Sequence, residues 1–491
     1  MERSQTGKEQ TSTSVVSKIT RNAVFLLLSR TTEIVFAVIT ISLLARYLGV
    51  NDYGDYSFVM AFVAIIITAA SFGIDFIMTR EIAKNKDKAS SLVVSAIVVR
   101  SITFVIIILL ISGFLFFTGY PSRIAFAIII ALLFENIRLL LFVFISVFRA
   151  FEKMSYEVIL TIITQSISFG LTLFVIICNL GFIAIFIASG ISYIVGAFLS
   201  LGIIYKRFFK LRAEKIFLSV ISLIKESYTL AVGIIVKLVY INIDVLLLKA
   251  MKSSADVALF QAPHKLFLSL NFLPSSIVMA AFPAFSRFSR DSSDSLMKIY
   301  EMLLKIVLLI MIPITVFCFS MSEPIIKAIF STGFIEAHIP FKIIMLTLPF
   351  VSMDFLLSFV LVSIGEQRIV MWNGIFCLIF NVLLDLLLIP KFSYNGAAVA
   401  TLCAYFLSFL FVSYCIAKRL RTIPIGAVLK EFVCGGFMWI FFSLFHGYNL
   451  FFVWPGAFLV FLGTFWALSI FSEKELTFVK DFIKLKTGFL L

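Results

Sequence analysis

The sequence predicts an all-α, polytopic membrane protein of about fourteen transmembrane helices, arranged as two six-helix lobes and a C-terminal helix pair. Of its 491 residues, 61% are hydrophobic and only 14% are charged, which is far from the composition of a soluble domain. Apolar runs close to the twenty or so residues that cross a bilayer recur along the chain. A weak internal repeat relates its two halves.

Fourteen apolar runs are predicted to be membrane-spanning helices, because a helix satisfies its own backbone hydrogen bonds in lipid. They lie at 22–45, 57–79, 91–117, 124–148, 157–178, 181–204, 226–250, 258–283, 301–321, 340–364, 369–389, 394–417, 425–446 and 450–471. Tight turns at 179–181 and 394–396 separate two of the closest pairs. The first run is too long for a signal peptide and lacks a small-residue cleavage site, so it is predicted to be an uncleaved first span.

Basic residues alternate between the two sides of the predicted helices, and this explains the formal charge of +14 without nucleic acid. Most of them lie in every second connection: Arg80, Lys84, Lys86 and Lys88; Arg149 and Lys153; Lys206, Arg207, Lys210, Arg212 and Lys215; Arg287, Arg290 and Lys298; Arg368; Lys418, Arg419 and Arg421. The opposite connections carry scattered bases: Arg46, Arg123, Lys249, Lys252, Lys327 and Lys391. The positive-inside rule therefore predicts that both termini are cytoplasmic.

The repeat defines the predicted domains. A shift of 204 residues places LLARYLGVNDYGDYSF over LLKAMKSSADVALFQA, with Asp52 on Asp256, Gly54 on Ala258 and Tyr56 on Phe260. An offset of six spans is even, so the repeats are parallel lobes. The predicted parts are an N-lobe (1–205), a basic cytoplasmic linker (206–225) that includes a surface amphipathic helix, a C-lobe (226–420) and two extra spans with a cytoplasmic tail (421–491).

Charged residues at membrane depth are costly and mark candidate functional positions. The polar groups at that depth are Arg30, Glu33, Asp75, Arg100, Glu135, Arg138, Lys237, Asp244, His264, Lys265, Lys305, Asp354 and Asp385. Asp75, Arg100 and Lys305 lie near span ends, where snorkelling to the interface is the favoured interpretation. Arg30 and Glu33, like Glu135 and Arg138, are three residues apart on one helix face, which suits a purely structural pair as well as a site.

The candidate substrate-binding residues are the cations Arg30, Arg138, Lys237 and Lys265. They outnumber nearby acids, and a surplus of buried positive charge favours an anionic cargo such as phosphate or carboxylate. Glu33, Glu135 and Asp244 are candidates for ion coupling or simple charge pairing. Pairing with a lysine is the favoured role for Asp244, seven residues after Lys237 on the same face.

The sequence carries no catalytic or metal-binding motif, so it predicts no enzyme, metal or cofactor. It lacks a phosphate-binding loop, and energy for transport is therefore expected from a proton or sodium gradient or from the cargo's own gradient. The six cysteines lie singly in apolar runs and are interpreted as small buried hydrophobes.

Six segments together resemble the bacterial Wzx-type polysaccharide flippases of the multidrug, oligosaccharidyl-lipid and polysaccharide exporter (MOP) superfamily. They are LLARYLGVNDYGDYSF (43–58), FGIDFIMTREIA (72–83), FRAFEKMSYE (148–157), IDVLLLKAMKSSADVALFQAPHKLF (243–267), FPAFSRF (282–288) and LIPKFSYNGAAVAT (388–401). One departure is Val257-Ala258-Leu259-Phe260, where the family pattern often has an acid or a Gly-x-Tyr.

The resemblance implies a MATE-like fold with a cavity that opens alternately to each face of the bacterial inner membrane. It also implies an undecaprenyl-pyrophosphate-linked oligosaccharide as cargo. This cargo would be flipped outward for the assembly of lipopolysaccharide O-antigen, capsule or exopolysaccharide. The implied partners are membrane lipid, a polysaccharide polymerase and a chain-length regulator. A cationic cavity suits a pyrophosphate, while the lipid tail stays in the bilayer.

Three alternatives remain from the sequence. A drug/cation antiporter of the same superfamily would favour an acid-lined cavity. A peptidoglycan-precursor flippase differs only in cargo. A polysaccharide polymerase or ligase is also polytopic and basic, but by resemblance it would carry a large outer loop, and none is present between the predicted spans.

Overall fold

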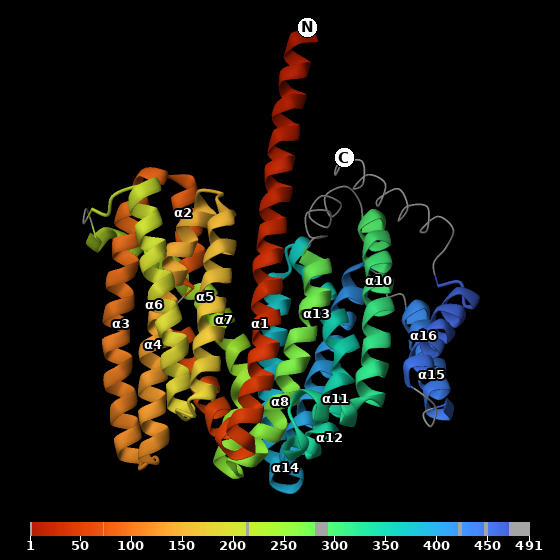
Figure 1. Ribbon diagram of the computed structural model, residues 1–491. Helices are drawn as coiled ribbons and strands as arrows, with labels where there is room; N and C mark the ends of the chain where they lie inside the picture. Colours follow the sequence, from red (N-terminus) through yellow and green to blue (C-terminus); the bar gives the residue numbers. More distant parts are fainter. Residues whose placement is uncertain are drawn as a thin grey trace. The chain divides into compact units, whose positions relative to one another are not determined.

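The computed structural model describes residues 2–71, 73–212, 216–279, 293–420, 425–445 and 450–470, and these residues form helices and turns without any strand (Figure 1). The helices are α1 (Glu2–Ser71), α2 (Ile74–Lys84), η1 (Lys86–Lys88), α3 (Ala89–Thr118), α4 (Ser122–Ala150), α5 (Met154–Ile177), α6 (Phe182–Arg207), α7 (Ile216–Met251), α8 (Ser254–Leu270), α10 (Ser293–Ser320), α11 (Ser322–Ile329), η2 (Thr332–Ala337), α12 (His338–Met345), α13 (Thr347–Ser363), α14 (Gln367–Leu420), α15 (Ile425–Phe445) and α16 (Leu450–Ala467). The predicted all-helical fold is confirmed. The 282–288 motif and the predicted tail from 471 lie outside the described residues.

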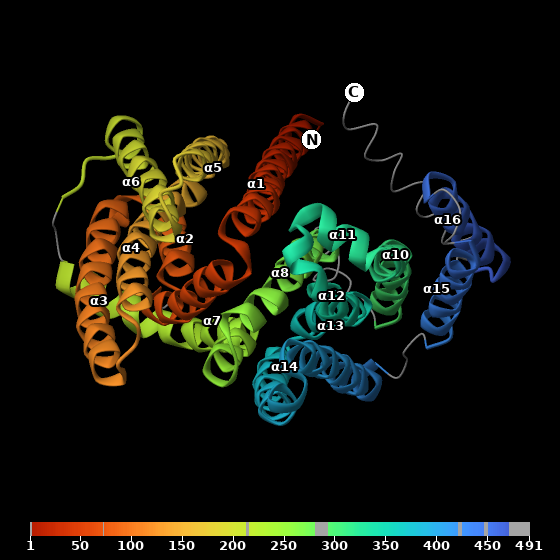
Figure 2. The same cartoon turned by 60° about the horizontal axis from the view of Figure 1, so that its bottom comes forward.

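The chain divides into two compact units, residues 1–258 and 259–491. In the first, α4 packs on α1, α2, α3 and α6, and α5 packs on α1 and α6. These helices run side by side in both views (Figures 1 and 2). In the second, α13 packs on α10 and α14, and α15 packs on α10 and α16.

Nine helical segments of the described chain are long and apolar enough to cross a membrane, which makes this a multi-pass membrane protein. Two of them contain more than one predicted span. At 1.5 Å per residue, the 70 residues of α1 and the 54 of α14 would measure about 105 Å and 81 Å if straight, against a bilayer core of about 30 Å. Helical geometry is interrupted at Gly49 (φ 69°) and Ser393 (φ 50°), which lie between predicted spans. The total of fourteen stays a prediction.

Glycines allow two of the turns to approach neighbouring backbone. A Cβ on Gly54 would lie 1.8 Å from the carbonyl oxygen of Ser254, and a Cβ on Gly396 would lie 2.5 Å from that of Leu388. Both distances are far inside van der Waals contact, and the obstacle is backbone that cannot rotate away. Each turn therefore requires glycine at this position.

The second predicted span, 57–79, is broken where the sequence analysis expected a continuous helix. α1 ends at Ser71, Gly73 adopts a left-handed conformation (φ 64°), and α2 begins at Ile74. Arg100 bridges this break: its guanidinium donates to the carbonyl of Ala70 and to the carboxylate of Asp75, at 3.2 Å each. Arg100 is completely buried, so the snorkelling interpretation is wrong for it.

The predicted linker also differs. The chain is irregular from 208 to 212, but residues 216–225 form the beginning of α7 instead of a separate surface helix. α7 packs on α1, α2 and α3, and so belongs by its contacts to the first unit. The division into six-span lobes at 205 and 226 rests on the repeat and stays a prediction.

Connections that the charge pattern assigns to one side meet at one end of the first unit. At the end with few bases, Arg123 binds Asp52 with two hydrogen bonds of 2.8 and 2.9 Å, and Gly181 N–H donates to the Tyr47 hydroxyl. At the basic end, Ser90 Oγ donates to the carbonyl of Lys210. These contacts support the predicted alternation of sides, while the cytoplasmic location of the basic end remains a prediction.

Candidate functional site

The first unit holds a cluster of four charged residues, which we call the α1–α4 charge cluster: Arg30 and Glu33 of α1, and Glu135 and Arg138 of α4. Arg30 Nη1 donates to Glu33 Oε2 at 2.8 Å, and Arg138 Nε donates to Glu135 Oε2 at 2.5 Å. Both pairs are three residues apart, the spacing that brings side chains together on one helix face. The cluster is therefore neutral as a whole, and Arg30 and Arg138 each have a carboxylate partner.

The two pairs share surroundings because α1 packs on α4. Glu33 is close enough to Arg138 to interact electrostatically, and the Tyr193 ring of α6 is close to Glu33, Glu135 and Arg138. The Arg138 guanidinium also lies 5.3 Å from the centre of the Phe142 ring, a cation–π contact. Arg30 is the most accessible member, with 56% of its side chain exposed. It can therefore contact a ligand without first unfolding its surroundings.

The remaining predicted cations, Lys237 of α7 and Lys265 of α8, form no ion pair with any residue in the described parts of the chain. Lys237 is exposed and Lys265 is half-buried. Measured along its own helix, Lys237 lies about 21 Å before the end of α7 at Met251, and Lys265 about 17 Å after the start of α8 at Ser254. Their location at membrane depth stays a prediction from the sequence, which places them in the apolar runs 226–250 and 258–283.

Asp244 does not pair with Lys237 as the sequence favoured. The two are seven residues apart, which places them on one face but about 10.5 Å apart along the helix axis. Asp244 is buried, with 2% of its surface exposed, whereas Lys237 is exposed. His264, next to Lys265, is buried between the rings of Phe260 and Phe267, with centroids at 5.3 and 5.9 Å. That environment suits a neutral, structural histidine.

Other predicted polar residues lie in the second unit. The Asp354 carboxylate of α13 accepts a hydrogen bond of 2.6 Å from Ser408 of α14, and Ser408 also accepts from Asn373 at 2.7 Å. Asp385 is fully buried in α14. Lys305 of α10 is 9% exposed, so snorkelling is wrong for it too.

Sequence reasoning missed Glu431, a fully buried residue of α15. Glu431 lies only six residues after the start of the helix, where a polar residue is usually at the end of a span. No basic residue lies three or four positions away, so the sequence did not suggest an ion pair on the same helix face. No group of three or more metal-ligating side chains occurs among the residues that the structure describes.

Comparison with known proteins places this geometry in a family. Residues 19–289, more than half of the chain, match the family described as "Polysaccharide biosynthesis protein". No curated protein matches the sequence.

Several solved structures share the fold. The lipid II flippase MurJ in an inward closed conformation is similar with a TM-score of 0.74 and 18% identity, over 94% of this chain and 99% of that one. A point mutant of the Vibrio cholerae MATE transporter VcmN is similar with a TM-score of 0.58 and 17% identity, over 84% of this chain and 99% of that one. A MOP superfamily transporter from Pyrococcus furiosus, described as having a binding pocket of reverse polarity, has a TM-score of 0.57 and 14% identity, over 83% of this chain and 96% of that one.

These findings confirm the resemblance drawn from the sequence motifs at the level of family and fold. The similar structures are transporters or flippases, and the MATE-like fold that the resemblance implied agrees with them. The chain belongs to the polysaccharide biosynthesis protein family and has the fold of the MOP superfamily transporters.

Proposed function

We propose that the protein is a flippase that moves undecaprenyl-pyrophosphate-linked oligosaccharide repeat units from the cytoplasmic to the outer leaflet of the bacterial inner membrane. The repeat units would serve assembly of O-antigen, capsule or another exopolysaccharide. Membership of a polysaccharide biosynthesis family supports a glycan as cargo. The fold, similar to that of a lipid II flippase, supports a lipid-linked form of it.

The observation that carries the proposal is that two lysines predicted at membrane depth, Lys237 in the first unit and Lys265 in the second, each form no ion pair within the described chain. A charge at membrane depth is costly and is normally paired or faces water. These two lysines have no carboxylate partner in the described chain, so an anionic ligand would supply the missing countercharge. A pyrophosphate provides that charge, and its lipid tail remains at home in hydrocarbon.

The α1–α4 charge cluster contributes differently. Arg30 and Arg138 are held by carboxylates, and a guanidinium binds phosphate in the same two-pronged way that it binds carboxylate. An entering pyrophosphate would compete with Glu33 for the exposed Arg30. Glu33, Glu135 and Asp244 then hold the arginines or an ion in the cargo-free state, and a proton or sodium gradient supplies the driving force.

The proposed cargo can be tested in a strain that lacks the gene. We expect such a strain to accumulate lipid-linked repeat units on the inner leaflet and to recover surface glycan when the wild-type gene is restored. Normal surface glycan in the deletion strain, with a functioning glycan pathway and no second flippase, would exclude the proposal.

The similarity to MurJ favours a second candidate, a flippase for the peptidoglycan precursor lipid II. Rescue of a strain depleted of its own lipid II flippase would identify this cargo. The MATE-like structures raise a drug/cation antiporter as a third possibility, for which overexpression would increase drug resistance. The unpaired lysines argue against a cationic cargo, because like charges repel at short range.

A further inference from the structure

Glu431 of α15 is a buried acid that has no role in the transport cycle proposed above. It is 0% exposed, and neither of its carboxylate oxygens has a hydrogen-bond partner among the residues that the structure describes. A carboxylate in water or in a salt bridge always has such partners. An ionised carboxylate without them is strongly disfavoured inside an apolar region, and such a group normally takes up a proton instead.

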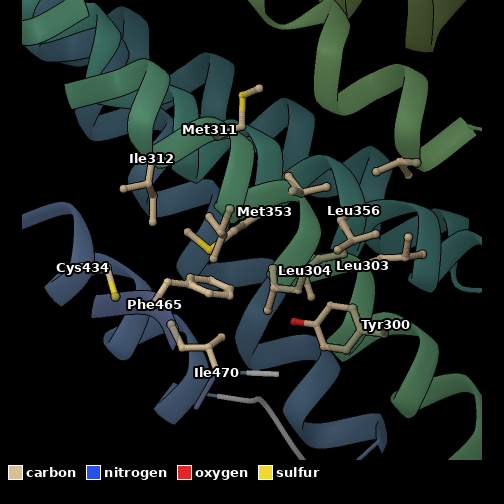
Figure 3. Close-up of a cluster of buried hydrophobic side chains, with 14 of the residues drawn as sticks. Tyr300, Leu303, Leu304, Met311, Ile312, Met353, Leu356, Cys434, Phe465 and Ile470 are labelled. Atoms are coloured by element: carbon tan, nitrogen blue, oxygen red, sulfur yellow. The ribbon is translucent and has the colours of Figure 1, made fainter. Parts of the chain in front are cut away.

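The surroundings of Glu431 are apolar. Cys434, Met438 and Phe442 follow it at spacings of three, seven and eleven, on the same helical face, and all three belong to the main hydrophobic cluster of the second unit. Figure 3 shows Cys434 of α15 near Phe465 of α16. Leu304 and Tyr300 of α10 lie on the other side of Phe465 in the same cluster. Glu431 lies one turn before Cys434 and extends the same face.

The titratable groups around Glu431 come from the helices that pack on α15. From α10, Lys305 acts on it electrostatically, and the cluster also includes the Tyr300 hydroxyl. α16 carries no charged residue within Leu450–Ala467. On α15 itself, Lys430 turns away and donates to the carbonyl of Leu468 at 3.1 Å, and Cys434 is the nearest thiol in sequence. Within the described ranges, Lys305 is therefore the cation that acts on this carboxyl group, and no hydrogen bond stabilises the charged form.

The acids of the α1–α4 charge cluster have the opposite environment. Glu33 and Glu135 each accept a charge-assisted hydrogen bond from an arginine at 2.5 to 2.8 Å, which stabilises their ionised forms. Glu431 and Lys305 together allow two states: a neutral carboxyl buried as it stands, and a carboxylate that an approach of Lys305 would stabilise.

We propose that Glu431 is a proton-binding site, and that its protonation and deprotonation couple transport to a proton gradient. The site lies in α15, outside the two predicted lobes, about 9 Å from the beginning of the helix. That end of α15 follows the predicted cytoplasmic connection. Proton binding by Glu431 stands on the burial alone, whereas the coupling rests on the proposed function.

Proton binding is tested on purified protein in lipid nanodiscs, without any cargo. The infrared C=O stretching band of a protonated carboxylic acid should be present in the wild type and reduced in Glu431→Gln. Above its midpoint the Glu431 component should fall about tenfold in protonated fraction per pH unit. The matched control is Glu366→Gln, which removes a surface carboxylate paired with Arg419 at 2.8 Å and should leave the band unchanged.

Dicyclohexylcarbodiimide, which reacts with protonated carboxyls in apolar surroundings, gives the same answer without a substitution. Peptide mapping of the labelled wild-type protein should place the label on Glu431. An identical infrared band in wild type and Glu431→Gln, or a label on other carboxyls only, would overturn the assignment.

Coupling is tested in liposomes with an imposed pH gradient. The wild type should move lipid-linked oligosaccharide several-fold faster with the gradient than without it, and Glu431→Gln should move it at one rate in both conditions. An equal response of both proteins would disprove the coupling. Absence of cargo movement by the wild type would instead count against the proposed function and leave the infrared result intact.

Discussion

Lys249 donates a hydrogen bond of 2.7 Å to Asp55 and thereby joins two turns that the internal repeat relates to each other. Ser254 Oγ donates to the same carboxylate oxygen at 2.6 Å. The two charged side chains are only 16% and 15% exposed. These two segments of the first unit are therefore joined by a partly buried ionic contact.

Asp55→Asn is expected to weaken this contact. The substitution removes the charge that Lys249 and Ser254 share, and a hydrogen bond to a charged group contributes about 1.5–3 kcal/mol. We expect the free energy of unfolding to fall by that amount, measured by denaturation in detergent. The swapped pair Asp55→Lys with Lys249→Asp should recover part of the loss.

Asp52→Asn is the matched control, because Asp52 is in the same turn and also forms an ion pair. Its partner Arg123 is 51% exposed, and exposed pairs contribute about 0–1 kcal/mol. Equal losses from Asp55→Asn and Asp52→Asn would show that the Lys249 contact has no special role.

Gly54→Ala should separate the same two turns by steric clash. The new methyl group would meet the carbonyl oxygen of Ser254, and overpacking of this kind costs about 1–3 kcal/mol. Cysteines placed at the two turns would then cross-link more slowly. Gly113→Ala in α3 is the control, since no atom lies within 4 Å of that Cβ position; unchanged cross-linking in Gly54→Ala would refute the close approach.

Arg100→Met should lower the free energy of unfolding more than Asp55→Asn or Gly54→Ala does. It leaves Asp75 as a charge without its partner and exposes the Ala70 carbonyl, and breaking one side of a buried pair costs about 3–5 kcal/mol. The double variant Arg100→Met with Asp75→Leu should recover stability, because no charge then remains buried. A double variant that is as unstable as the single one would show that another interaction holds the break in the second span.

The sequence predicted those features that depend on neighbouring residues. Spans followed from hydropathy, the breaks near Gly49 and Ser393 from polar turn residues, and the Arg30–Glu33 and Glu135–Arg138 pairs from a spacing of three. Each of these is encoded within one or two helical turns.

Contacts between distant segments could not be predicted in the same way. Arg100 and Asp75 are 25 residues apart and meet only because α3 folds back on α2, so both looked like snorkelling residues. The burial of Glu431 depends on α10 and α16 packing against α15. The sequence also counted Arg30 and Arg138 toward a surplus of positive charge, although both have paired acids, so that only Lys237 and Lys265 of the four candidate cations lack an ion pair in the described chain.

If cations predicted at membrane depth receive an anionic lipid headgroup, flipping in liposomes depends on Arg30, Lys237 and Lys265. The measurement is therefore flipping by the triple variant Arg30→Gln, Lys237→Gln and Lys265→Gln. The control is Lys88→Gln, Lys327→Gln and Lys391→Gln, which removes the same charge from exposed connections. We predict a large loss of lipid-linked oligosaccharide flipping in the first protein at unchanged expression, and near wild-type flipping in the second. Wild-type flipping by the first variant would show that these cations do not receive the lipid headgroup.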